Sequence, residues 1–176
     1  IELSESALRS NIRFLRRLIG RETILTSVVK GNAYGHGIET YVPMAERCGV
    51  RAFATFGAAE AQRIAGCCRP DTAVMIMGDL ADEVVPWAVE RGVSFYVFDL
   101  QRLDRAIRAG RRIGRPARVH VELETGLNRT GFDGRGLRSV IRRVADAPGA
   151  VVVEGVCTHF AGAESIGNHV RVTQQI

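Results

Sequence analysis

The order of apolar runs and amphipathic segments is the feature that most limits the folds open to this chain. Short runs rich in β-branched residues alternate with longer segments of helical periodicity, and the pair recurs six times in 176 residues. Repeated strand-then-helix units with near-continuous apolar strands indicate a parallel sheet covered by helices. The predicted strands are residues 23–29, 52–56, 73–78, 94–98, 117–123 and 151–159.

A helix is predicted after each strand, and one more ahead of the first. Ser4 is a suitable N-cap for the leading helix, which would run to about Leu18. The apolar face of this helix would consist of Leu8, Ile12, Leu15 and Leu18. The helices after the strands are expected within residues 39–50, 57–67, 82–92, 99–112, 136–146 and 168–176.

Two α/β architectures fit six such units. Right-handed crossovers carry the chain steadily in one direction, which suits either a doubly wound open sheet or a (β/α)8 barrel. A complete barrel usually takes ~250 residues and eight strands. The barrel interpretation therefore implies an incomplete TIM-barrel-type fold, and the length suits one well-packed domain.

The distribution of charge argues against a nucleic-acid partner. The net charge is +5, yet the basic residues are scattered along helical segments without interleaved aromatic residues. Arg105, Arg108 and Arg112 follow helical spacing, which predicts a solvated helix face.

Other classes of site and location are also disfavoured. No apolar run reaches the length of a membrane span. Cys48, Cys67, Cys68 and Cys157 lack the paired spacing of zinc and disulfide motifs. We therefore expect reduced thiols, a cytoplasmic location, no membrane association and no metal site.

Lys30 is the only lysine among 24 basic residues. A primary amine can lose its proton, attack a carbonyl and form a Schiff base, whereas a guanidinium effectively never deprotonates in a protein. A single lysine in an arginine-rich chain is therefore a candidate for covalent chemistry.

The ends of three predicted strands carry polar side chains that could form one site. Lys30 ends the first strand, Arg129 lies in the loop after the fifth, and His159 closes the sixth. In parallel α/β proteins the functional groups gather at the carboxyl ends of the strands. The glycine-rich loop after Lys30 matches neither nucleotide-binding fingerprint, so no nucleotide site is predicted there.

Three segments at these strand ends resemble motifs of the alanine racemase family. "VVKGNAYGHG" (28–37) is similar to its cofactor-lysine motif, a lysine followed by N-A-Y-G-H-G. "ETGLNRTGF" (124–132) resembles D-T-G-M-x-R-x-G-F, and "GVCTHFA" (155–161) resembles G-x-x-T-H-F-A. Order and spacing agree over nearly the whole chain. The resemblance implies an N-terminal (β/α)8 barrel that binds pyridoxal phosphate, followed by a mostly β domain, in a homodimer.

The resemblance also implies roles for individual residues in the interconversion of L- and D-amino acids, with alanine as the foremost substrate. Lys30 would hold pyridoxal phosphate as an internal aldimine and then act as one of two bases at Cα. Tyr34 would reach the phosphate. Arg129 would hydrogen-bond the ring oxygen and help hold the substrate carboxylate, and His159 would lie against the pyridine ring.

Two positions depart from the family pattern. Many members carry a lysine seven residues before the motif arginine, carboxylated so that it braces that arginine, and this chain has Glu122 there. Glu122 could supply a carboxylate directly. Glu124 also replaces the usual aspartate, so alanine, serine, or a longer or basic amino acid all remain open as substrates.

Residues 1–176 are expected to be the N-terminal part of such a barrel. The last two strands and the β domain, which carries the opposite base, a tyrosine acting from the partner subunit, are expected to be absent. Tyr41 and Tyr96 are interpreted as packing residues. These residues alone are therefore expected to be weakly active or inactive.

Three alternatives to a racemase are open to such a chain. A decarboxylase of the related barrel group is expected to carry an H-x-G-S-like motif, which the residues after His159 do not provide. A carrier that binds pyridoxal phosphate without turning over amino acids is favoured by the lack of a second domain. A part-barrel with no cofactor would leave Lys30 and the three motif-like strand ends without an explanation.

Overall fold

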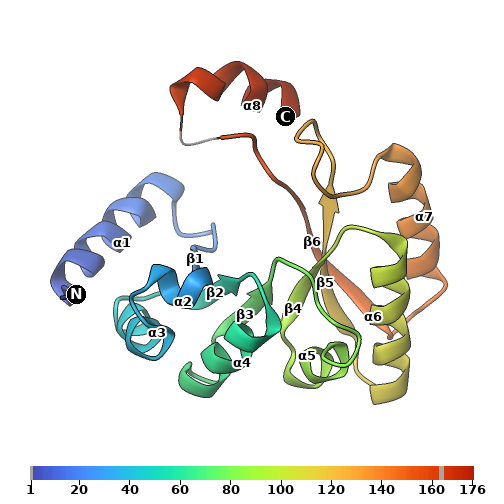
Figure 1. Ribbon diagram of the computed structural model, residues 1–176, viewed down its shortest axis with the longest axis horizontal. Coiled ribbons are helices and arrows are strands. Elements are labelled where there is room, and N and C mark those ends of the chain that lie inside the picture. The colour runs from blue at the N-terminus through green and yellow to red at the C-terminus, as the bar shows by residue number, and fades with distance from the viewer. Residues whose placement is uncertain (1, 163–164) are drawn as a thin grey trace. The chain divides into compact units, whose positions relative to one another are not determined.

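The computed structural model of the chain describes residues 2–162 and 165–176. The chain divides into two compact units, Ile1–Leu80 and Ala81–Ile176. Each unit is built from parallel strands that alternate with helices (Figure 1). The predicted α/β class and all six predicted strands are confirmed.

The first unit contains a parallel sheet in the order β1-β2-β3. Its elements are α1 (Glu5–Ile19), β1 (Thr26–Val28), α2 (Lys30–Tyr34), α3 (Ile38–Arg47), β2 (Ala52–Thr55), α4 (Ala58–Cys67) and β3 (Ala73–Ile76). β2 is the central strand, and every one of its residues is buried. β1 is shorter than predicted, because pairing with β2 begins only at Thr26.

α1 begins where the sequence predicts. The Ser4 hydroxyl accepts a hydrogen bond from the backbone N–H of Ala7 at 3.3 Å, which is the N-cap arrangement. Of the predicted apolar face, Ile12 is buried, whereas Leu15 and Leu18 are 40% and 67% exposed.

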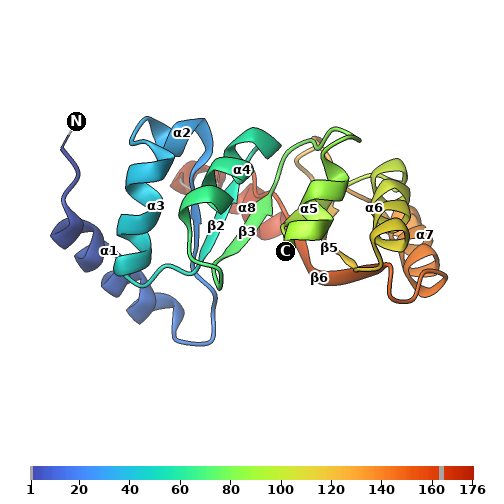
Figure 2. The ribbon, with the colours of Figure 1, turned by 90° about the horizontal axis from the view of Figure 1, so that it is seen from below.

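The second unit contains a parallel sheet in the order β4-β5-β6. Its elements are α5 (Val85–Arg91), β4 (Ser94–Val97), α6 (Leu100–Ile113), β5 (Ala117–Leu123), α7 (Gly134–Ala145), β6 (Val151–Thr158), a short 3-10 turn (Ile166–Asn168) and α8 (His169–Gln175). α6 lies between α5 and α7 in Figure 1 and Figure 2. It buries Leu103, Ala106 and Ile107, and Asp99 caps its first turn.

Besides the 3-10 turn at Ile166–Asn168, the structure adds α2, which the sequence does not predict. The sequence favours a loop over residues 31–37, but Lys30–Tyr34 forms a single left-handed turn directly after β1, with positive φ angles from Gly31 to Tyr34. Within the described residues, none of the helices combines the length and the hydropathy needed to cross a lipid bilayer.

Close packing of α6 against the start of β6 makes Gly110 a sensitive position. A Cβ atom at this buried glycine would lie 1.9 Å from the carbonyl oxygen of Ala150. We expect Gly110→Ala to lower the free energy of unfolding by about 2–3 kcal/mol, because the helix must move off the strand.

Thermal unfolding of the intact protein tests this, with an expected loss of roughly 5–10 °C. Gly66→Ala is the matched control, because Gly66 is also helical and has open space around it. Equal melting temperatures for the two variants would contradict close packing of α6 against the start of β6 at Gly110.

Candidate active site

Lys30 lies at the carboxyl end of β1, as predicted, and begins a left-handed turn. The φ angles of Asn32, Ala33 and Tyr34 are 55°, 55° and 52°. The turn is closed by hydrogen bonds from Ala33 N–H to the carbonyl of Val29 at 2.8 Å and from Gly35 N–H to that of Gly31 at 3.0 Å. Ala33 is buried, while Lys30 and Tyr34 are exposed. The turn therefore carries the predicted amine and the predicted phenol together.

The Glu60 carboxylate, at the start of α4, holds this turn. It accepts hydrogen bonds from the backbone N–H of Asn32 at 2.9 Å and from the hydroxyl of Thr55. Burial by itself raises the pKa of Glu60, but the hydrogen bonds from Thr55 and from the backbone of Asn32 and Gly31 outweigh it. The net pKa lies below the ordinary value of 4.5.

The Asn32 side chain ties the same turn to two helices. Its Oδ1 accepts hydrogen bonds from the Ile38 N–H at 3.2 Å and from Arg63 Nη2 at 2.7 Å. Arg63 also binds both carboxylate oxygens of Glu39 at 2.7 Å. The hydrogen bond from Arg63 lowers the pKa of Glu39 to about 2. α3, α4 and the turn thus share one polar network.

Arg129 lies in a closed loop after β5. Phe132 returns to the strand, where its N–H donates to the Glu122 carbonyl at 2.8 Å and its carbonyl accepts from the Glu124 N–H at 3.1 Å. Gly131 permits this return, because its φ is 121° and a Cβ atom there would lie 2.5 Å from the Glu124 nitrogen. The Glu124 carboxylate accepts from the Gly126 and Arg129 N–H groups. Backbone hydrogen bonds, that from Asn128 foremost, lower its pKa.

A buried carboxylate holds the Arg129 side chain. Glu122 is 2% exposed, and its Oε1 lies 3.4 Å from Arg129 Nη2. Its other oxygen accepts a hydrogen bond from the Thr130 hydroxyl at 2.8 Å. About half of the Arg129 side chain stays exposed, at 51%. One edge of the guanidinium is therefore fixed while the rest can meet a ligand.

Tyr96, interpreted from the sequence as a packing residue, lies in the same surroundings. It is half-buried and shares a hydrogen bond with Cys157, and the charges of Glu122 and Arg129 act on it. Burial raises the pKa of Tyr96 well above its ordinary range and that of Cys157 to about 11. Both groups are therefore protonated at neutral pH.

His159 follows β6, and its imidazole is exposed. Its backbone carbonyl accepts a hydrogen bond from Gln175 Nε2 at 3.0 Å. The same nitrogen donates to Thr125 Oγ1 at 3.1 Å, and Gln175 Oε1 accepts from the Ala161 N–H at 2.8 Å. α8 thus fastens the loops that carry Arg129 and His159.

The predicted site residues fall into two groups, Lys30 with Tyr34 in the first unit and Arg129 with His159 in the second. Sequence reasoning missed Glu60, Thr130 and Gln175, which hold these groups. Glu60 does occupy the third residue of its helix, a common position for a carboxylate. Its partner at Asn32 is 28 residues away, however, so no local pattern reveals the contact.

The chemistry of the side chains fits pyridoxal phosphate. A primary amine can condense with the aldehyde, a phenol can donate a hydrogen bond to the phosphate, and a guanidinium can bind an anionic oxygen. Lys30, Tyr34 and Arg129 supply these three groups, and each is exposed enough to meet a ligand.

Comparison with known proteins points to a single family. The family described as "Alanine racemase, N-terminal domain" matches residues 3–176. The alanine racemase of Desulforamulus reducens is 34% identical over 169 residues, which cover 93% of this chain and 44% of that protein. The chain therefore spans about half the length of the curated relatives it matches.

Solved structures agree with the sequence comparison. The alanine racemase of Streptomyces coelicolor A3(2) superposes with a TM-score of 0.89 at 29% identity, covering 97% of this chain and 46% of that one. The alanine racemase of Bacillus anthracis with bound L-Ala-P gives a TM-score of 0.84 at 25% identity, covering 97% of this chain and 44% of that one. The likeness confirms the predicted barrel type of the fold.

The Glu60 network predicts a dependence of stability on pH. Because folding lowers the pKa of Glu60, its ionised form adds stability above the unfolded pKa near 4.5, and that stability is lost as the pH falls through the folded pKa. Glu60→Gln should therefore be less stable than the wild type at pH 7 by about 1–2 kcal/mol. The difference should shrink as the pH falls below about 4.5.

Thermal unfolding of both proteins between pH 7 and pH 3 measures this. Glu22→Gln is the control, since Glu22 is exposed and makes no side-chain hydrogen bond with the residues that the structure describes. If the difference in stability between wild type and Glu60→Gln stays constant over this pH range, the ionised Glu60 carboxylate does not stabilise the fold through its hydrogen bonds.

Proposed function

This chain belongs to the alanine racemase family, and we propose that the protein is a pyridoxal-phosphate-dependent racemase that interconverts L- and D-alanine. The observation that carries the proposal is the position of Lys30, the only lysine, on a strand-end turn that Glu60 and Asn32 hold in place. Residues 1–176 would form the N-terminal part of the family's barrel, in a cytoplasmic homodimer.

Lys30 is the proposed point of attachment for the cofactor. When bound, pyridoxal phosphate delocalises the negative charge that develops as Cα of the amino acid loses its proton. The Lys30 amine, released once the amino acid has taken its place, would move that proton on one face of Cα. Tyr34, four residues along the turn, would donate a hydrogen bond to the phosphate.

Arg129 is the proposed ligand of the cofactor ring oxygen and of the substrate carboxylate. Its contact with the buried Glu122 sets the direction of the guanidinium before any ligand arrives. Many relatives are expected to use a carboxylated lysine for this purpose. Glu122 supplies a carboxylate without modification, and Thr130 fixes it from the other side.

His159 would lie against the pyridine ring, and the hydrogen bond from Gln175 to its carbonyl positions its backbone. The base on the opposite face of Cα would be the family's tyrosine from the partner subunit. Alanine is the proposed substrate because the family is named for it and because the B. anthracis relative is described with bound L-Ala-P.

Racemisation by the complete gene product tests the proposal. Supplied with pyridoxal phosphate and L-alanine, it should form D-alanine, as measured by chiral chromatography, and L-serine and L-arginine should react more slowly. Lys30→Ala should lower the rate by at least roughly a thousandfold, because both the attachment point and a base are lost.

Lys30→Arg is the matched variant, since it keeps the positive charge and removes the amine that can deprotonate. It should be as inactive as Lys30→Ala. A protein that binds the cofactor but forms no D-amino acid from any of the three substrates would instead support the carrier.

Removing the charge of Glu122 tests the support of Arg129. We expect Glu122→Gln to lower kcat/KM for L-alanine by roughly 10- to 100-fold, because Arg129 loses its ionic partner. Added bicarbonate should not change the wild-type rate, since no lysine carboxylation is needed.

Glu154→Gln is the control, because Glu154 also pairs with an arginine, Arg118, but lies in the middle of β6, away from the loop that carries Arg129. Unchanged kcat/KM in Glu122→Gln, or a wild-type rate that depends on bicarbonate, would contradict this role for Glu122.

A further inference from the structure

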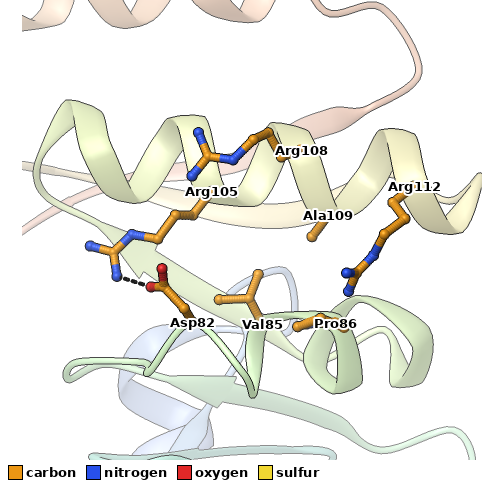
Figure 3. Close-up of a pocket in the computed structure, with 7 residues that line it drawn as sticks. All are labelled: Asp82, Val85, Pro86, Arg105, Arg108, Ala109 and Arg112. Atoms are coloured by element: carbon orange, nitrogen blue, oxygen red, sulfur yellow. Dashed lines mark hydrogen bonds and ion pairs between the residues drawn. The ribbon is translucent and has the colours of Figure 1, made fainter.

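A groove of about 280 Å³ lies between α5 and α6 of the second unit. Figure 3 shows Arg105 and Arg112 extending from α6 toward α5 at opposite ends of the groove. Val85, Pro86 and Ala109 lie between them and form an apolar floor (Figure 3). The groove is built from residues that have no part in the proposed racemase site.

The lining of the groove carries an excess of positive charge. It contains three arginines, Arg105, Arg108 and Arg112, and a single acidic residue, Asp82. Asp82 is already paired with Arg105. Asp104, on the same helix, is paired with Arg143 of α7 at 2.8 Å. Asp82 and Asp104 therefore each already have an arginine partner.

Arg108 and Arg112 are the two cations available to a ligand. Both are exposed, as a solvated helix face predicts. Neither has an ion pair or a side-chain hydrogen bond with any residue in 2–162 or 165–176. Arg105 differs, because its side chain is only 25% exposed and Asp82 fixes it. The groove thus contains one guanidinium held by an ion pair, that of Arg105, and two without a partner among these residues, those of Arg108 and Arg112.

The size and the charge of the groove limit what can bind there. Three guanidinium groups and one carboxylate leave a net charge of +2, which a phosphate monoester dianion would neutralise. The volume lies at the low end for ligand pockets, so the organic part must be small. The apolar floor favours a compact hydrophobic group over a sugar or a bare ion.

We propose that this groove binds a small organic phosphate, with the phosphate at Arg112 and the apolar group on Val85, Pro86 and Ala109. The exposed Arg108 side chain follows α6 away from Arg112 in Figure 3 and would turn toward the phosphate when it binds. The proposal is independent of the racemase function, because it involves neither Lys30 nor the strand-end loops.

Calorimetric titration of the intact protein with phenyl phosphate tests the groove. The double variant Arg108→Gln/Arg112→Gln should bind phenyl phosphate at least roughly tenfold more weakly than the wild type. Inorganic phosphate should bind the wild type more weakly than phenyl phosphate, because it leaves the apolar floor uncovered.

Arg138→Gln is the matched control, since Arg138 is an exposed arginine on α7 that does not line the groove. It should bind phenyl phosphate as the wild type does. Thermal unfolding verifies that each variant is folded, which is expected because the substituted side chains are exposed.

Three results would overturn the proposal. One is equal affinity for phenyl phosphate in the double variant and the wild type. Another is no binding to the wild type at millimolar concentration. The third is a single-stranded oligonucleotide that binds more tightly than phenyl phosphate and loses its affinity in the double variant, since that would make the arginines a nucleic-acid surface.

Discussion

The left-handed turn after Lys30 is the constraint on which the chemistry proposed for the first unit depends. Asn32, Ala33 and Tyr34 all adopt positive φ angles, and each such residue costs roughly 1–2 kcal/mol relative to right-handed backbone. Such a turn persists only where its surroundings fix it. Glu60 and Arg63 bind its backbone and its Asn32 side chain. The position of the Lys30 amine is therefore set by contacts made elsewhere in the unit.

In the second unit, a buried carboxylate, Glu122, positions the exposed Arg129 side chain. Glu122 is an acidic residue in the interior, which is unfavourable unless the carboxylate is paired and hydrogen-bonded. Arg129 and Thr130 provide those contacts, and Gln175 joins the two loops from α8. In both units a carboxylate holds the segment that carries the proposed functional side chain, while that side chain itself stays exposed.

The order of strands and helices can be predicted from the sequence, but the contacts that hold the proposed site residues cannot. Strand and helix periods are local, so the six strands and the Ser4 cap can be predicted from neighbouring residues. The strand-end positions of Lys30 and His159 follow from the same reasoning. The turn at Asn32 cannot be predicted, because a run of positive φ at non-glycine residues contradicts local preference and is imposed by Glu60 from a distant helix.

The sequence predicts that Arg105, Arg108 and Arg112 form a solvated helix face, and it does not predict the groove that they line. Helical spacing places them on one face, but only the packing of α5 beside α6 turns that face into a groove with an apolar floor. Tyr96 resembles an ordinary packing residue in the sequence because its partner Cys157 belongs to another strand. Contacts between distant residues, which a single sequence does not encode in any local pattern, account for each of these differences.

Attachment of pyridoxal phosphate to Lys30 is the central claim, and one measurement tests it directly. The protein is incubated with pyridoxal phosphate, reduced with borohydride and digested, and its peptides are mapped by mass spectrometry. Residues 1–176 contain a single lysine, so an adduct on a lysine within them can only lie on Lys30. The account predicts a phosphopyridoxyl adduct on the peptide that contains Lys30. No adduct there in the complete gene product, or an adduct at the amino terminus alone, would contradict it.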